Sequence, residues 1–274
     1  MRFVETYISD ERKFRAFREI CVNQIFNDKQ NSLMNTRNII CAAMALLMSM
    51  PAMASNWRVR AVKEKEMKTI TIEMRDAEAF SLIDLSVAGD LEYTQSLNGK
   101  SGVTLIVSED LADKVEATIH HGRLVVAYKR GTKHHFTVNS QLKVIAHSPA
   151  LSVVSVNGSG DVMLRGSIRT ESLALHINGS GDVEAHDLTS QRVSVNINGS
   201  GDVQLAGKAR EAHYDINGSG DIDCDQLHCM HVNAAINGSG DIDCYASESI
   251  NANINGSGDV DCSGQPKIQR YDRR

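Results

Sequence analysis

Aspartates recur at one position of a motif that the chain repeats six times, and their spacing could support metal chemistry. The motif is Asn-Gly-Ser-Gly-Asp followed by Val or Ile, and its copies occupy residues 157–162, 178–183, 198–203, 217–222, 237–242 and 255–260. Successive copies begin 21, 20, 19, 20 and 18 residues apart. A nearly constant period of this length is typical of solenoids, in which every repeat forms one coil that stacks on the next. The motif aspartates should therefore form a column.

The last three repeats carry a second aspartate two residues after the motif aspartate, so two acidic columns should run side by side there. Two carboxylates about 5 Å apart repel each other by roughly 1 kcal/mol in water, and by several-fold more at a lower dielectric constant. Residues 211–266 hold ten acidic residues and no Lys or Arg. Because Ca²⁺ prefers several carboxylate and carbonyl oxygens, the pattern predicts a calcium-binding edge. Its candidate ligands are Asp221, Asp223, Asp241, Asp243, Asp259 and Asp261.

An alternative interpretation needs no cation. Each motif aspartate could accept backbone N–H bonds from its own bend, as in an Asx turn, with columns of Asn and Ser side chains beside it. Both interpretations stay open at this point, and the sequence indicates no cofactor other than possible Ca²⁺.

Four cysteines lie among the later repeats: Cys224, Cys229, Cys244 and Cys262. Three of them share one position in successive repeats, which predicts a buried column of thiols that pack as small apolar groups. A disulfide between adjacent coils is the alternative in an oxidising compartment. A zinc site made of Cys224, His228, Cys229 and His231 is disfavoured, because Cys224 should point into the core.

Apolar residues alternate with polar ones on both sides of each motif, as in Val193-Ser194-Val195-Asn196-Ile197. A period of two indicates strands with one face inward. Each coil should contain a strand, a Gly-Ser-Gly bend, a second strand and a short third segment anchored by residues such as Leu188, Leu227 and Ala246. The motif glycines fall on the inward parity, where a narrow tube leaves no room for a Cβ. The predicted fold is an all-β, right-handed parallel β-solenoid with about 20 residues per coil and a less regular N-terminal β cap.

The chain before the repeats divides by composition. Residues 1–33 are a non-native extension if translation starts at Met34, and residues 34–54 resemble a secretory signal peptide, with Arg37, an apolar stretch over 39–50 and cleavage after Ala54. A cytoplasmic N-terminus on a signal anchor is the alternative. We expect a linker or edge strand over 55–79, the β cap over 80–150, six coils over 151–264 and a tail over 265–274. Ala88-Gly89-Asp90-Leu91 resembles a decayed copy of the motif.

Composition narrows the functional classes. The net charge is -5, without the excess of Lys and Arg that nucleic-acid binding needs. After signal cleavage no stretch is long and apolar enough to span a membrane, so we expect an extracytoplasmic protein in the periplasm, on the outer surface or secreted. Catalysis requires a unique acid and base, whereas this chain repeats the same residues in every coil. Aromatic residues make up only 5% of the chain, which gives a sugar-binding groove few stacking partners.

Residues 80–95, Pro149-Ala150-Leu151 and the repeated Ile-Asn-Gly-Ser-Gly-Asp resemble the head GIN domain of auto-transporter adhesins, over roughly residues 80–262. The resemblance implies a parallel β-solenoid with an adhesive role in a secreted or envelope protein, and it supplies no catalytic or binding residues. We therefore predict a non-enzymatic binding or adhesion module that presents Asn, Ser and Asp columns to an unknown surface ligand, glycan or protein, and that forms a homo-oligomer. The alternatives are a calcium-stabilised envelope scaffold and a polysaccharide-active β-helix enzyme.

Overall fold

A computed structural model describes residues 69–74, 77–131 and 141–274, and these residues form strands and turns without a helix. The proposed extension, the signal peptide and most of the proposed linker lie outside the described residues, so those predictions stay untested. Over the described ranges, no helix has the length and the apolar character that a membrane span requires.

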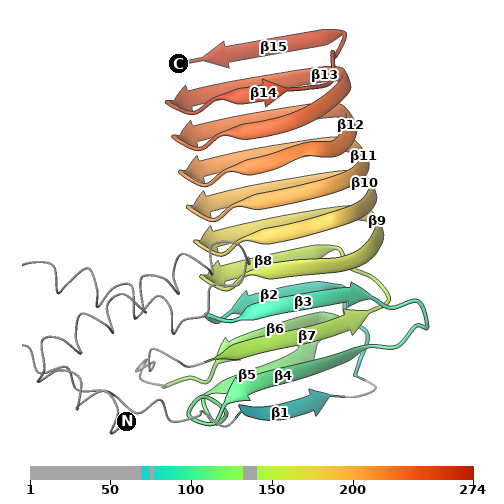
Figure 1. Ribbon diagram of the computed structural model, residues 1–274, viewed down its shortest axis with the longest axis vertical. Coiled ribbons are helices and arrows are strands. Elements are labelled where there is room, and N and C mark those ends of the chain that lie inside the picture. Colours follow the sequence, from blue (N-terminus) through green and yellow to red (C-terminus); the bar gives the residue numbers. More distant parts are fainter. Residues whose placement is uncertain (1–68, 75–76, 132–140) are drawn as a thin grey trace, which may run out of the picture. The chain divides into compact units, whose positions relative to one another are not determined.

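Parallel strands stacked in register form the main part of the fold (Figure 1). From β9 to β13, each strand begins directly after a motif aspartate and ends at the first glycine of the next motif, so the winding has the predicted spacing of about 20 residues. The right-handed parallel β-solenoid expected from the repeats is confirmed. Its strands are β8 (Val153–Gly158), β9 (Val162–Gly179), β10 (Val183–Gly199), β11 (Val203–Gly218), β12 (Ile222–Gly238) and β13 (Ile242–Gly256).

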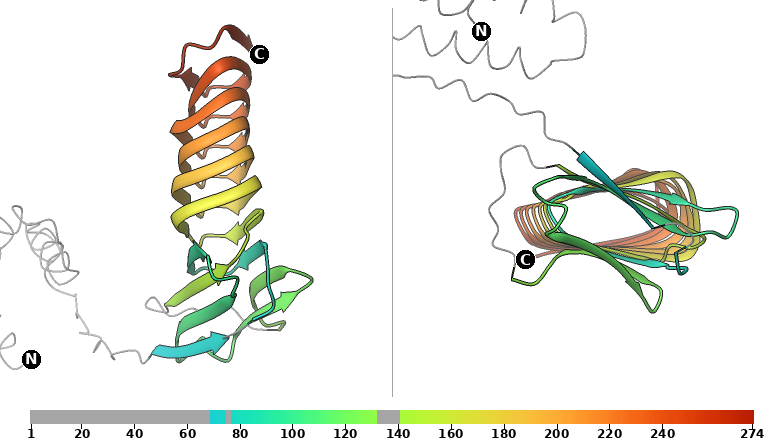
Figure 2. Two further views of the ribbon diagram at one scale, coloured as in Figure 1. Left: turned by 90° about the vertical axis from the view of Figure 1, so that its right-hand side faces the viewer. Right: turned by 90° about the horizontal axis from the view of Figure 1, so that it is seen from below.

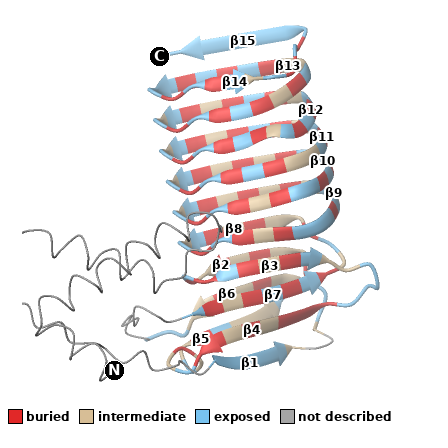
Figure 3. Ribbon diagram, in the orientation of Figure 1, coloured by how far each residue is buried: buried red, intermediate tan, exposed pale blue. Residues whose placement is uncertain are grey.

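Alternating burial explains why these sequences form walls around a core (Figure 3). Val193, Val195 and Ile197 are fully buried in β10, and the residues between them are more accessible. The predicted third segment is not a separate strand, because each coil continues as one strand of up to 18 residues. A register shift, such as the one between Ala185 and Leu188, marks the far bend. The coils are therefore flattened rings with two long walls (Figure 2).

Close stacking of backbones explains the motif glycines. A Cβ added to Gly218 would lie 2.0 Å from the carbonyl oxygen of Gly199 in the preceding coil, and Gly218 also has a φ of 152°. A Cβ on Gly220 would lie 2.1 Å from the carbonyl oxygen of Gly201. We expected a Cβ at the motif glycines to be excluded by the narrow inside of the tube, but its shortest contacts would be with the backbone of the preceding coil, along the stacking direction.

The N-terminal strands continue both walls less regularly. In one wall the strand order is β1-β4-β7-β3-β9, and the pairs β1–β4 and β4–β7 are antiparallel. In the other wall β5 and β6 form a hairpin, β6 pairs with β2, and β2 pairs with β8. The decayed motif stacks as predicted, because a Cβ on Gly160 would lie 2.2 Å from the carbonyl oxygen of Gly89. These strands are β1 (Thr69–Met74), β2 (Leu82–Ser86), β3 (Asp90–Gln95), β4 (Gly102–Ser108), β5 (Val115–His120), β6 (Arg123–Tyr128) and β7 (Leu142–Ser148).

The C-terminal residues extend the stack by one more layer. Residues 265–274, expected to be a tail, contain β15 (Ile268–Arg273). Both β14 (Val260–Cys262) and β15 pair in parallel with β13, each with a different part of that strand. On β15, the positions aligned with the buried Ile250, Ala252 and Ile254 of β13 are Gln269, Tyr271 and Arg273. The alternation of apolar residues that identifies the earlier strands is therefore absent here.

Candidate functional site

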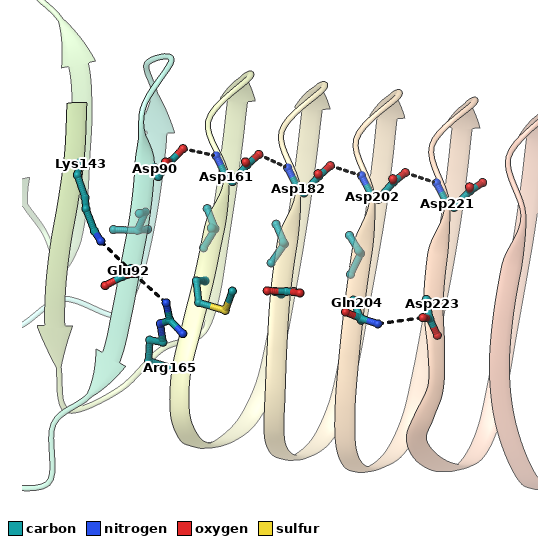
Figure 4. Close-up of a pocket in the computed structure, with 16 residues that line it drawn as sticks. Asp90, Glu92, Lys143, Asp161, Arg165, Asp182, Asp202, Gln204, Asp221 and Asp223 are labelled. Atoms are coloured by element: carbon teal, nitrogen blue, oxygen red, sulfur yellow. Dashed lines mark hydrogen bonds and ion pairs between the residues drawn. The ribbon is translucent and has the colours of Figure 1, made fainter. Parts of the chain in front are cut away.

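A groove of about 580 Å³ follows one wall of the stack from β3 to β12 (Figure 4). Two outward-facing columns border it, and one buried Leu, Val or Ile in each strand separates them. The motif column contains Asp90, Asp161, Asp182, Asp202 and Asp221. The second column contains Glu92, Met163, Glu184, Gln204 and Asp223. The strand register aligns these side chains, so every coil adds one position to each column.

The motif carboxylates are linked to one another through the backbone. Oδ1 of Asp182 accepts the N–H of Asp202 at 2.8 Å, and Oδ1 of Asp202 accepts the N–H of Asp221 at 2.9 Å. The same bond recurs from coil to coil up to Asp259, whose carboxylate contacts the Arg273 guanidinium. The Asx-turn interpretation placed these bonds within one bend, but the structure places them between coils. Every motif carboxylate before Asp259 thus accepts a backbone N–H, which offsets part of the repulsion within the column.

Asparagine side chains form a second ladder at the start of the motif. The Asn198 amide donates to Oδ1 of Asn178 at 3.1 Å, and the Asn217 amide donates to Oδ1 of Asn198 at 3.2 Å. The series ends on the N-terminal region, where Asn157 donates to Asp84 at 2.9 Å. The predicted Asn column is confirmed, and its first member donates to Asp84, which lies outside the repeated motif.

The N-terminal end of the groove carries a cluster of opposite charges. Glu92 contacts Arg165 at 2.9 Å and Lys143 at 3.0 Å (Figure 4). Hydrogen bonds from Arg165 and then Lys143 lower the pKa of the Glu92 carboxyl. This cluster was not predicted from the sequence, because its cations come from β7 and β9, far from β3 in the chain. The position of Glu92, two residues after the aspartate of the decayed motif, was the one feature that could have placed it in the second column.

The acidic columns of the last coils are less well compensated. Burial first, and then the neighbouring charges of Asp261 and Asp223, raise the pKa of the Asp243 carboxyl. Gln204 donates to Oδ2 of Asp223 at 3.0 Å. Among the described residues, no group of three or more His, Cys, Asp or Glu side chains is arranged to hold a metal ion. Calcium binding at this edge therefore stays a prediction.

The cysteines lie inside the stack, away from the groove. Cys224, Cys229 and Cys244 are buried, Cys262 is half-buried, and all four are thiols. Burial raises the pKa of Cys229 to about 11 and raises those of Cys224 and Cys244 further. The Tyr214 hydroxyl lies beside these thiols and is buried without a hydrogen-bond partner in the described structure.

The residues of the disfavoured zinc site do not come together. His231 contacts the Ser249 hydroxyl at 2.9 Å through Nδ1, and the His228 ring packs on Tyr245 with centroids 4.3 Å apart. Cys224 is buried. The described side chains thus give no support for zinc at this place.

The fold and its ladders define a class of parallel β-solenoid domain in which a Gly-Ser-Gly bend recurs in each coil. Residues 79–266 match the family described as "Putative auto-transporter adhesin, head GIN domain". The match covers more than half of the chain, and the protein belongs to this family. No curated protein matches it.

Solved structures of similar fold come from Bacteroides and Parabacteroides species. A "putative adhesin" from Bacteroides fragilis is 30% identical with a TM-score of 0.71, over 76% of this chain and 94% of that one. A "putative adhesin" from Parabacteroides merdae is 24% identical with a TM-score of 0.60, over 75% and 93% of the two chains. A "putative lipid binding protein" from Parabacteroides distasonis is 23% identical with a TM-score of 0.61, over 75% and 94%. The last two likenesses show the fold alone.

Proposed function

We propose that this protein is a non-enzymatic adhesion module, secreted or held at the cell envelope, that binds a surface glycan or protein along the groove. The observation that carries the proposal is the pair of polar columns that lines the groove over successive coils. Family membership and the 30%-identical adhesin support an adhesive role and an extracellular or envelope location. The signal peptide over residues 34–54 is the part of the sequence that would direct such export.

The geometry of the columns suits an extended ligand. Parallel strands lie about 4.8 Å apart, so the groove offers one carboxylate or amide per coil at a fixed spacing. The ladder holds Oδ1 of each motif aspartate, which keeps the carboxylates in place before a ligand arrives. Each coil can make a weak contact to a hydroxyl or cationic group of the ligand. These contacts together raise the affinity, because once the first has formed the later ones form at a high effective concentration.

Repetition also argues against catalysis in the groove. The motif column presents the same carboxylate at each level, whereas hydrolysis of a polysaccharide needs one acid and one base with different pKa values. In the second column, the contacts of Glu92 with Arg165 and Lys143 stabilise the charged form of its carboxyl. A carboxyl with a lowered pKa is poorly suited to act as a general acid.

A double variant inside the groove and a control variant outside it test the binding surface. Glu184 lines the groove on β10, whereas Asp187 lies on the same strand outside it. We expect Glu184→Gln combined with Asp223→Asn to weaken binding to glycans or surface proteins about tenfold, which corresponds to about 1.4 kcal/mol. Asp187→Asn should leave binding within about twofold. Glycan arrays followed by calorimetry measure both. Equal affinities for all variants, or turnover of a bound polysaccharide, would contradict the proposal.

A calcium-stabilised scaffold is the second candidate, and the raised pKa of Asp243 favours it, because crowded carboxylates gain from a bound cation. The ions would lie among Asp221, Asp223, Asp241, Asp243, Asp259 and Asp261. A melting experiment with Ca²⁺, with Mg²⁺ as the control ion, tests this candidate. A calcium-specific rise in the melting temperature that Asp243→Asn abolishes would support it, whereas identical melts with both ions would remove it.

A further inference from the structure

Cysteines occupy one inward position in the last three layers of the stack. Cys224, Cys244 and Cys262 are direct register partners on β12, β13 and β14. Neighbouring parallel strands lie about 4.8 Å apart, and a disulfide joins Cα atoms about 4.4–6.8 Å apart. The backbone therefore places each cysteine within bonding range of the next one, although Cys244 can bond only one partner.

Side-chain contacts distinguish the two possible pairs. The Cys224 thiol lies beside the Tyr214 hydroxyl, whereas the Cys244 thiol lies against the thiol of Cys262. Solvent access also favours the Cys244–Cys262 pair, because Cys262 is half-buried, whereas Cys224 and Cys244 are fully buried. A dissolved oxidant can thus reach the thiol of Cys262 first.

We propose that Cys244 and Cys262 form a disulfide that fixes the last coil to the stack when the protein meets a small-molecule disulfide such as oxidised glutathione. The biological setting rests on the proposed extracytoplasmic location, where such oxidants keep disulfides stable. The bond closes a loop that contains all of β13 after Cys244, together with the final motif.

The reaction balances as two thiol–disulfide exchanges. The Cys262 thiol loses its proton and attacks one sulfur of the oxidant, which leaves as a thiolate while a mixed disulfide forms at Cys262. The Cys244 thiol then loses its proton and attacks the Cys262 sulfur, and the second half of the oxidant leaves. Two protein thiols are oxidised, one disulfide of the oxidant is reduced to two thiols, and the two protons go to those thiols.

The last layer is the part of the stack that gains most from such a bond. β14 has three residues, and within the described part of the chain it pairs with β13 and with no other strand, whereas the inner strands are held on both sides. The same freedom lets β14 adjust so that the Cβ atoms reach the separation of about 3.5–4.5 Å that a disulfide needs. A disulfide between β13 and β14 would oppose local unfolding of β14 at the end of the stack.

Oxidation of the full-length chain tests the proposal. After incubation with oxidised glutathione and digestion at acidic pH, mass spectrometry should find the Cys244 and Cys262 peptides linked. Peptide mapping is required because the chain also contains Cys21 and Cys41. Oxidation should raise the melting temperature of the wild type by roughly 5–10 °C, and Cys262→Ser should show neither the link nor the shift.

Cys224→Ser is the matched control, because it removes the other register partner and should retain both the link and the shift. A Cys224–Cys244 or Cys224–Cys229 link, or four thiols that persist after long exposure to the oxidant, would overturn the proposal. Because the oxidant is supplied in the experiment, these outcomes do not depend on where the protein resides or on whether it binds a surface ligand.

Discussion

The coils from β9 to β13 and the N-terminal strands from β1 to β7 bury similar cores with different bonds. In the coils, equivalent residues bond to one another, as in the Asn and Asp ladders. In the N-terminal region, single side chains bridge unlike partners. The Gln95 amide donates to the carbonyl oxygens of Pro149 and Arg169 at 2.9 and 3.0 Å, and its oxygen accepts the Arg169 N–H at 2.7 Å. Repetition thus fixes one region and individual contacts fix the other.

The comparison shows where a repeated motif tolerates change. Inside the stack, every motif residue is constrained by its counterparts in the neighbouring coils, so a substitution disturbs a contact between identical groups. At the first coil the layer below is β2 and β3 with a shortened bend, and this constraint is weaker. The same substitution should therefore cost less at the first motif than at the fourth.

Replacing the first motif glycine by alanine gives the largest expected contrast. Gly158 and Gly218 have similar φ angles of 145° and 152°. A Cβ on Gly158 would have its nearest atom at 3.6 Å, whereas a Cβ on Gly218 would meet the Gly199 oxygen at 2.0 Å. We expect Gly158→Ala to cost about 1–3 kcal/mol from backbone strain, and Gly218→Ala to cost roughly 3–5 kcal/mol because a steric clash is added.

Urea denaturation of the two variants measures this contrast. Gly99→Ala is a further control, because its φ is also positive at 75° and its Cβ would have no neighbour within 4 Å. If Gly158→Ala and Gly218→Ala were equally destabilised, stacking between coils would not be the reason for the glycines.

Much of the regular part of the fold could be predicted from sequence, because period-two burial and the fixed motif spacing act within each repeat. The ends could not be predicted in the same way. β15 has Gln269, Tyr271 and Arg273 at positions that would be apolar in an inner coil, since no described strand pairs with its other edge. The charge cluster of the groove joins Glu92 to Arg165 across 73 residues, and a pattern within one repeat cannot reveal such a contact.

Two buried tyrosines sharpen the same comparison at a smaller scale. In the N-terminal region the Tyr93 hydroxyl bonds to the carbonyl and hydroxyl oxygens of Ser148 at 3.0 and 2.9 Å. In the coils the Tyr214 hydroxyl has no such partner in the described structure. We expect Tyr93→Phe to destabilise the protein by about 1–3 kcal/mol, and Tyr214→Phe to be neutral or to stabilise it by up to about 1 kcal/mol.

Thermal melts of the two phenylalanine variants, made in the same buffer, provide the measurement. Both changes remove one oxygen from a fully buried ring, so each serves as the size control for the other. A loss of stability at Tyr214 as large as that at Tyr93 would mean that the thiols around Tyr214 act as real hydrogen-bond partners.

Glu92, at the N-terminal end of the groove, and Asp243, in the coil beyond its other end, should respond to pH in opposite ways. The pKa of Glu92 is lowered, so its ion pairs stabilise the protein at neutral pH, and this contribution is lost as the pH falls through the lowered pKa. The pKa of Asp243 is raised, so its charge destabilises the protein above the raised pKa, and protonation relieves this effect as the pH falls. Glu92→Gln should therefore lower stability at neutral pH, and Asp243→Asn should increase it.

Both effects should be small, about 0.5 kcal/mol or less, because solvent and salt screen these carboxylates. Urea denaturation at about pH 7 and again at about pH 3, below the ordinary pKa range of carboxyl groups, separates the two sites. At the lower pH the difference between each variant and the wild type should become smaller, because the wild-type carboxyls take up protons as the pH falls. A shift of the same sign for both variants at neutral pH would show that net charge, rather than the local partners of each carboxylate, controls the stability of the two ends.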